Sequence, residues 1–202
     1  MEQLLRKLVD AIVRNDTATF SKLLHQSPQL ATAAFSQGAT RHGAITSFIP
    51  EIGHYIYAGD TALHFAAAAY RAEMADQLLK AGADVRARNR RGTEPLHAAA
   101  FGSPGSTSWD PAAQAATIVC LIQGGADPNA PNMDGATPLH RAVRTRCAEA
   151  VRTLLKHGAD PSIRNKNGSR PLELAQHTTG RSGSGSPEAK AQQQEILQLL
   201  EG

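Results

Sequence analysis

The stretch Gly135-Ala-Thr-Pro-Leu-His-Arg-Ala-Val-Arg144 indicates most clearly how this chain folds. Thr137 can cap a helix whose first position is Pro138, because proline presets φ and needs no N–H partner at a helix start. Leu139 and Ala142 then fall on one face of that helix. The stretch therefore predicts a short helix that buries one side against a neighbour.

Three further stretches copy this pattern. Residues 59–68 (GDTALHFAAA) and 92–101 (GTEPLHAAAF) are close copies, and residues 168–177 (GSRPLELAQH) are a weaker one. The starts of successive copies are 33, 43 and 33 residues apart, so the period is 33 residues, with ten extra residues in the second unit. Such self-similarity is typical of a solenoid, in which stacked units share one core.

A second column of motifs completes each unit. Gly-Ala-Asp begins at Gly82, Gly125 and Gly158, each time shortly after an apolar pair such as Leu154–Leu155. Glycine suits the left-handed end of a helix, where other residues pay a steric cost. Between units an asparagine stands three residues before a glycine, which is typical of a type I turn. Each unit is thus predicted to contain a helix, a turn, a second helix and a short hairpin.

The 33-residue period, together with the motifs T-P-L-H and G-A-D, resembles the ankyrin repeat. The resemblance is strong over residues 59–202 and weak over residues 1–26, where only the spacing of a helix pair supports it. It implies an all-α fold, an ankyrin-repeat α-solenoid of stacked helix-turn-helix units joined by short β-hairpin fingers. We expect one domain over residues 1–202, made of an N-terminal capping helix pair (1–26), an irregular insertion (27–58), three repeats (59–91, 92–134 and 135–167) and a C-terminal capping repeat (168–202).

Three segments depart from the repeat pattern. In the insertion, Gln29–Phe35 is predicted to form a short helix, and the rest has no clear period; it is interpreted either as a cap on the first repeat or as a partner-binding loop. Residues 103–113 and 178–187 are inserts between the two helices of their units, with helices restarting at Asp110-Pro111 and Ser186-Pro187. Both inserts are either tolerated loops or part of a binding face. Trp109 is expected to fold back on the surface or to anchor a partner.

Positive charge is concentrated in the third repeat and the start of the fourth. Residues 141–170 contain eight lysines or arginines against two acidic residues. In the family that the motifs resemble, the finger tips and the exposed face of the first helix carry binding. Carried over by position and extended to the edge of the inserts, the partner-binding residues are Arg88, Arg90, Arg91, Phe101, Trp109, Met133, Arg144, Thr145, Arg146, Lys166 and His177.

No catalytic constellation stands out. The sequence lacks G-x-S-x-G, H-E-x-x-H, a P-loop and paired C-x-x-C motifs. His64, His97 and His140 share one motif column, where the imidazole is expected to bond backbone between neighbouring units. His42 and His54 could bind a metal only with a further ligand. We therefore expect no catalytic residue, no metal site and no cofactor.

Charge, hydropathy and cysteine content indicate the class of protein and its compartment. The net charge of +3 is modest, and no apolar run approaches the length that spans a membrane. The N-terminus is predicted to be an amphipathic helix and not a signal peptide, because charged residues interrupt its apolar positions. Cys120 and Cys147 are too few for a disulfide framework, which favours reduced thiols in a cytoplasmic protein. Cys147, beside Arg146, is interpreted as a core or helix-start residue in preference to a thiol of lowered pKa.

Three classes of function remain open. The first is a monomeric interaction module that binds an acidic or mixed surface of another protein through its concave face and fingers. The second is a nucleic-acid or polyanion binder, although the chain has no recognisable reader motif. The third is an enzyme, or a metal- or metabolite-binding protein, that uses the irregular N-terminal segment.

Overall fold

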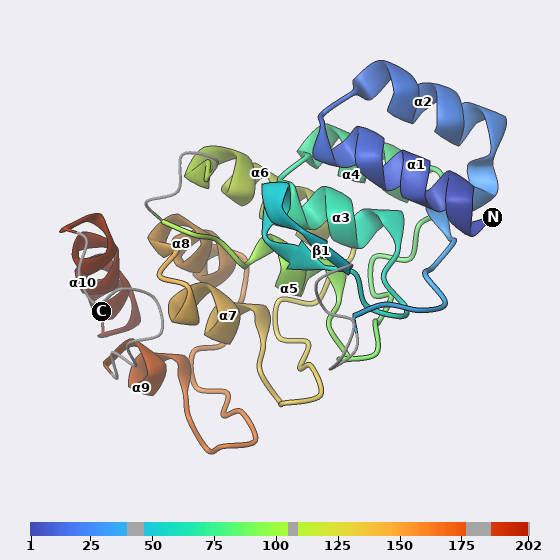
Figure 1. The fold of residues 1–202 in the computed structure, drawn as a ribbon. Coiled ribbons are helices and arrows are strands. Elements are labelled where there is room, and N and C mark those ends of the chain that lie inside the picture. The colour runs from blue at the N-terminus through green and yellow to red at the C-terminus, as the bar shows by residue number, and fades with distance from the viewer. Residues whose placement is uncertain (40–46, 105–108, 177–186, 202) are drawn as a thin grey trace.

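The computed structural model describes residues 1–39, 47–104, 109–176 and 187–201. In these ranges the chain forms five helix pairs that follow one another in a row (Figure 1). The pairs are α1 (Glu2–Val13) with α2 (Thr17–Gln26), α3 (Ala62–Ala68) with α4 (Ala72–Lys80), α5 (Pro95–Ala99) with α6 (Pro111–Gln123), α7 (Pro138–Arg144) with α8 (Ala148–Lys156), and α9 (Pro171–Gln176) with α10 (Pro187–Glu201).

The pairs stack into two rows of helices. The first helices form an inner row in which α1, α3, α5, α7 and α9 pack on one another in turn, and α4, α6, α8 and α10 form an outer row. Loops between successive pairs project to one side as fingers (Figure 1). This arrangement is the predicted α-solenoid.

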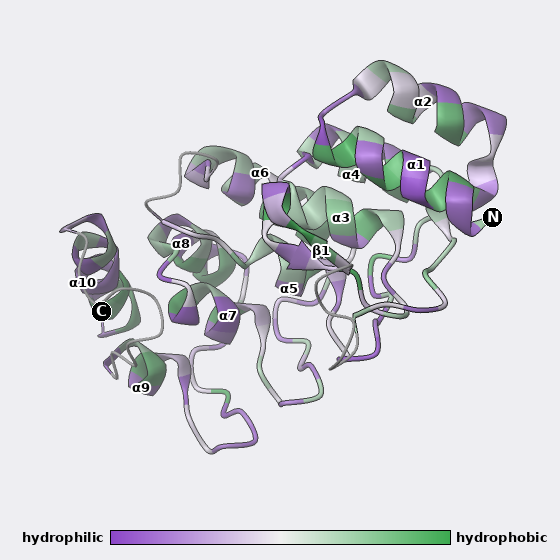
Figure 2. Cartoon of the chain, viewed as in Figure 1, coloured by the Kyte–Doolittle hydropathy of each residue, from purple (hydrophilic) through white to green (hydrophobic). Residues whose placement is uncertain are grey.

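The repeated leucines supply the core. Leu63, Leu96 and Leu139 of the inner row are completely buried, as are Leu121 and Leu154 of the outer row. Each contributes roughly 1.5–3 kcal/mol through removal of its side chain from water. Figure 2 shows hydrophobic positions along α3 and α5, whereas much of the loop between α8 and α9 is hydrophilic. Small alanines between the leucines allow the helices of the inner row to approach closely.

Local caps fix where the helices begin. Thr137 caps α7 as predicted, with its side chain accepting from the backbone N–H of His140. Asp110 caps α6, and its carboxylate accepts from the N–H groups of Ala112 and Ala113, at 2.9 and 3.0 Å. The predicted restart after the first insert is therefore confirmed. Ser186, the predicted cap of the last helix, lies outside the described residues.

The start of the insertion differs from the prediction. The helix predicted over Gln29–Phe35 is a single 3-10 turn, η1 (Pro28–Ala31). It ends early because the following backbone is extended: the N–H of Phe35 donates to the carbonyl of Asp60 (2.9 Å), and the N–H of Gly59 donates to that of Phe35 (2.8 Å). Pairing with a distant segment therefore takes the place of helix.

The insertion also contains a hairpin that the sequence did not predict. Strand β1 (Phe48–Ile49) pairs antiparallel with β2 (His54–Tyr55) across the 3-10 turn η3 (Pro50–Ile52). The hairpin lies against the inner row: the rings of His54 and Phe65 in α3 have centroids 5.4 Å apart, and Figure 1 shows β1 beside α3. Part of the face formed by α1 and α3 is therefore covered, which agrees with the cap interpretation.

Candidate protein-binding surface

The fingers owe their shape to three asparagines. The side-chain oxygen of Asn132 accepts from the N–H groups of Asp134 and Ala136, each at 2.9 Å. The N–H of Gly135 donates to the carbonyl of Asn132 (3.0 Å), with Gly135 at a φ of 72°. Asn89 and Asn165 make the same bonds. The predicted turns are thus confirmed, although the only paired strands in the described part of the chain are β1 and β2, so these fingers are turns and not regular β-hairpins.

Backbone hydrogen bonds join each finger to the next. The N–H of Arg90 donates to the carbonyl of Ala58 (2.7 Å), that of Met133 to Arg91 (3.1 Å), and that of Lys166 to Asp134 (2.9 Å). These bonds hold the finger tips in one register. Side chains two residues before each turn glycine consequently form a row along the tips.

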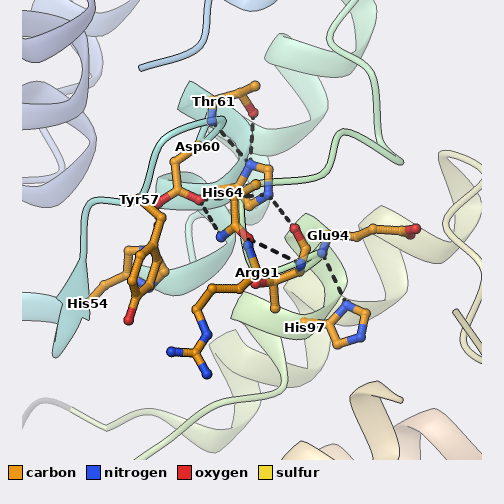
Figure 3. A network of polar contacts seen from close by, with 10 residues as sticks. His54, Tyr57, Asp60, Thr61, His64, Arg91, Glu94 and His97 are labelled. Carbon is orange, nitrogen blue, oxygen red and sulfur yellow. Dashed lines mark hydrogen bonds and ion pairs between the residues drawn. The ribbon is translucent and has the colours of Figure 1, made fainter. Parts of the chain in front are cut away.

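The repeated histidines join the units further inside (Figure 3). The Nδ1 atom of His64 accepts from the N–H of Thr61 (3.2 Å), so its Nε2–H donates to the carbonyl of Thr93 in the next unit (3.0 Å). The two later histidines repeat this pattern: Nε2 of His97 bonds to Ala136 and Nε2 of His140 to Ser169. The predicted backbone role of these histidines is confirmed.

Burial keeps these imidazoles neutral. Desolvation lowers the pKa of His97 to about 3, and it also lowers the pKa values of His64 and His140. In the last unit Glu173 stands in the histidine column. Its carboxylate accepts from the N–H of Arg170 (2.9 Å), which reproduces the bond that each histidine Nδ1 accepts within its own unit.

A buried carboxylate ties the hairpin to the stack. Asp60 is completely buried and accepts from the N–H of Tyr57 (2.7 Å) and from the side-chain amide of Asn89 (2.8 Å), with His54 Nε2 at 3.4 Å (Figure 3). Burial alone would raise the pKa of Asp60, but the hydrogen bonds to His54 and to the N–H of Tyr57 lower it overall. The carboxylate is thus held ionised inside the protein.

Most of the predicted finger residues are exposed and basic. Arg90 lies over the ring of Tyr57 with 5.5 Å to the centroid, and its guanidinium donates to the carbonyl of Ala39. Lys166 is exposed, and Met133 is 60% exposed. Arg91 is exposed and lies 3.7 Å from the carboxylate of Asp134. These four residues form one surface along the finger tips.

Arg88, unlike Arg90 and Arg91, pairs with a buried carboxylate. Its Nε donates to Oε1 of Glu94 at 3.0 Å, and the Glu94 side chain is only 2% exposed. A further bond joins its guanidinium to the carbonyl of Pro131 (3.3 Å). Arg88 therefore neutralises a buried carboxylate while part of it remains at the surface.

The predicted residues of the inner row lie at or near helix ends. Arg144 is the exposed last residue of α7, and Thr145 follows it with its hydroxyl donating to the carbonyl of Arg141 (3.1 Å). Arg146 has a φ of 59° and lies in the turn before α8. Phe101, just beyond α5, is partly buried beneath Arg141, whose guanidinium lies 5.1 Å from the ring centroid.

Family models agree with this geometry. A model described as ankyrin repeat matches residues 58–90, and one described as ankyrin repeats (many copies) matches residues 121–175. The chain is an ankyrin-repeat protein. No curated protein matches it significantly.

One predicted site residue of this ankyrin-repeat protein, Trp109, lies apart from the finger surface. Trp109 packs against the core, and its indole N–H donates to the side-chain oxygen of Gln114 (3.0 Å), so the indole is folded back. It also lines a cavity of about 220 Å³ with Tyr70 and Arg71, at the ends of the inner helices. His177 lies outside the described residues, as does most of the second insert.

Sequence reasoning missed several residues that the repeat stack brings to the same surface. Tyr57 occupies the alignment column of Arg90, Met133 and Lys166, two residues before a turn glycine, and this column position could have identified it. Arg141 belongs to the basic stretch of residues 141–170 but is not among the residues that the sequence predicts to bind a partner. No repeat signal marks the exposed aromatic residues Phe48 and Tyr55, because they belong to the insertion.

The described ranges also bear on three other features: a metal site, a reactive cysteine and a membrane-spanning helix. There, no three histidine, cysteine or acidic side chains gather as a metal site would require, and His42 is not among the described residues. Burial raises the pKa of Cys147 to about 11, which argues against a reactive thiol. No helix of the described segments is both long and apolar enough to cross a bilayer.

Proposed function

We propose that this ankyrin-repeat protein binds an acidic segment of another protein along the open part of its inner face and its finger tips. Ankyrin repeats are in general protein–protein interaction modules, and the proposal adds where and what this one binds. The hairpin of residues 47–57 covers part of the inner face over α1 and α3, so the proposed surface runs over the fingers and α7.

The observation that carries the proposal is a group of cations without acidic partners. Within the described part of the chain, Arg90, Arg144 and Lys166 have no carboxylate within 4.0 Å, and Arg91 reaches Asp134 only at 3.7 Å with both side chains exposed. An exposed pair of that kind contributes about 0–1 kcal/mol, so it leaves Arg91 available. A positive surface of this kind accelerates encounter with acidic partners and favours them over basic ones.

The proposed role is binding, in line with the typical behaviour of ankyrin repeats, and it requires no catalytic group. Cys120 and Cys147 are both unpaired. That state fits a reducing compartment, and we place the protein in the cytoplasm on that basis.

Affinity capture from lysate of the source cell, followed by mass spectrometry, tests the proposal. The test variant reverses Arg90, Arg91, Arg144 and Lys166 to glutamate. Arg88 is left unchanged, because a glutamate there would face buried Glu94. The control variant reverses Lys22, Lys80, Lys156 and Lys190, which are exposed on α2, α4, α8 and α10 and give the same change in net charge.

We expect one partner with an acidic segment to co-purify with the wild type and the control but not with the test variant. Equal capture by all three folded proteins would place the binding surface elsewhere. Capture of nucleic acid in place of protein, with a steep loss of binding as salt rises, would support the polyanion alternative.

A further inference from the structure

The hairpin of the insertion has one buried and one exposed face. Alternate residues of paired strands point to opposite sides. On one side, His54 packs on α3, Ile56 is buried, and Ile49 packs against the core. On the other side Phe48 and Tyr55 face each other across the hairpin, with ring centroids 4.6 Å apart, and remain 38% and 37% exposed. The exposed face is therefore an aromatic surface next to the fingers.

This aromatic surface continues into the basic fingers. The ring of Tyr57 lies 6.4 Å from that of Tyr55, and the guanidiniums of Arg90 and Arg91 lie 5.5 and 5.8 Å from its centroid. Met133, the most exposed large apolar side chain of the fingers, follows in the same finger-tip row. We call these six residues the aromatic–arginine strip: Phe48, Tyr55, Tyr57, Arg90, Arg91 and Met133.

A positive charge without a counterion lies beside the strip. Arg141 is partly buried over Phe101, and its Nε is buried without a hydrogen-bond partner among the described residues. No carboxylate of the described residues comes within 4.0 Å of it. The pKa of Arg141 is lowered to about 10. Burial is the largest cause, the charge of Arg144 is the next, and the charge of Arg91 adds to them. The hydroxyls of Tyr57 and Tyr70 raise the pKa of Arg141.

A buried donor without an acceptor is costly, and nearly all buried polar groups in proteins have a hydrogen-bond partner. The groups around Arg141 are aromatic or cationic, so an anion is the ligand that complements them. A carboxylate placed between Arg141 and Arg144 would offset both charges. Neighbouring carboxylates could then contact Arg90 and Arg91, while an apolar side chain rests against Phe48, Tyr55 and Met133.

We propose that the inserted hairpin and α7 together form a recognition site for a short acidic protein segment with a bulky apolar side chain, in which one carboxylate is bound by Arg141 and Arg144. This inference rests on the proposed function and adds the anchor residue and the chemistry of the segment. One face of each aromatic ring is already occupied by a neighbouring ring or guanidinium, which leaves less room for stacked bases. This arrangement favours a protein segment over nucleic acid.

Selection of short random peptides displayed on phage against the purified full chain tests this inference. Enriched peptides are then measured by fluorescence anisotropy with the wild type and three variants. Arg141→Met removes the charge but keeps a side chain over Phe101, and Phe48→Ser with Tyr55→Ser removes the aromatic face. Arg152→Met, on the outer helix α8, is the matched control. Single-stranded oligo-dT serves as a competitor.

We expect enriched peptides to combine acidic residues with a bulky apolar residue, and to lose about tenfold or more in affinity with Arg141→Met and with the double serine variant, but not with Arg152→Met. The melting temperature of Arg141→Met should be unchanged or higher, because the variant removes a buried charge without a counterion. A lower melting temperature together with unchanged peptide affinity would show a structural role and overturn the inference.

The two proposals fail in different ways. If acidic peptides bind but keep their affinity in Arg141→Met and in the double serine variant, the proposed function stands and the recognition site is wrong. If acidic peptides are not enriched, both proposals are overturned. If oligo-dT displaces the peptides from the strip and binds more tightly, a protein segment is the wrong occupant.

Discussion

The Nε2 atom of His64 lies 3.0 Å from the backbone carbonyl oxygen of Thr93, so one repeat donates a hydrogen bond to the next across 29 residues. The same imidazole accepts from the N–H of Thr61, which begins its own helix. One side chain thus fixes a helix start and a neighbouring finger at once. His97 and His140 repeat this arrangement along the stack, and we call the three residues the histidine ladder.

Substitution of a ladder histidine should therefore destabilise two repeats together. His140→Ala leaves the N–H of Thr137 and the carbonyl of Ser169 without their partner, and we expect a loss of about 2–3 kcal/mol in the free energy of unfolding. Urea denaturation followed by circular dichroism measures this. His25→Ala, at an exposed position of α2, should change stability by less than about 0.5 kcal/mol. Equal effects of the two substitutions would contradict the role of the ladder.

The ladder also predicts an acid-sensitive fold. The pKa of His97 is about 3 in the folded protein against an ordinary value of 6.5, so below pH 6.5 the unfolded chain binds more protons than the folded one. Its contribution to stability is complete above about pH 6.5 and is lost as the pH falls toward about 3. Between about pH 6.5 and 5, where carboxylates contribute little, wild-type stability should fall with decreasing pH, and the fall should be smaller in His97→Asn. Parallel pH profiles for the two proteins would count against a neutral buried imidazole.

The leucine column should carry much of the packing energy. Leu154 is completely buried between α8 and its neighbours, and Leu154→Ala is expected to cost about 2–5 kcal/mol and to unfold part of the stack. Leu155 is the matched control, since it is adjacent in sequence but only partly buried. Thermal melts of both variants measure this loss of stability. An unchanged melting temperature of Leu154→Ala would refute the predicted role of the leucine column.

Asp60 should hold the inserted hairpin on the inner row. Asp60→Asn keeps the size of the side chain but weakens its bonds to Tyr57 N–H, Asn89 and His54, so we expect a loss of about 1–3 kcal/mol. Amide hydrogen exchange of residues 47–57 should speed up in this variant. Asp76→Asn, which breaks only an exposed pair with Lys80, should leave that exchange unchanged. No change in exchange with Asp60→Asn would mean that other contacts hold the hairpin.

Repetition explains how much of the fold the sequence predicts. Thr137, Pro138 and Leu139 have counterparts in other units, namely Thr61, Pro95 and Leu96, and their local roles as cap, helix start and core residue need no knowledge of distant contacts. The stacked helices, the asparagine turns and the bridging histidines could be predicted on that basis. Asp110-Pro111 was predictable for a related reason, since capping is a local property of the chain.

The unpredicted parts depend on contacts that occur once. Phe35 pairs with the backbone of Gly59 and Asp60, and this non-local pairing outweighs the helical preference of residues 29–35. The hairpin pairs Phe48 with Tyr55, and neither has a counterpart in another unit. Arg141 lies over Phe101 from the preceding unit, so its burial could not be read from its own repeat. The indole of Trp109 is folded back because Gln114, on the helix that follows the insert, accepts its N–H.

Hydrogen exchange of the complex between the wild-type protein and its captured partner would show directly which face of the stack binds. We predict slower exchange in the finger segments 86–92, 129–135 and 162–168 and in the hairpin 47–57, with little change in the outer helices α4, α6 and α8. Protection confined to those outer helices, with unchanged exchange in the fingers, would contradict a binding surface on the inner face.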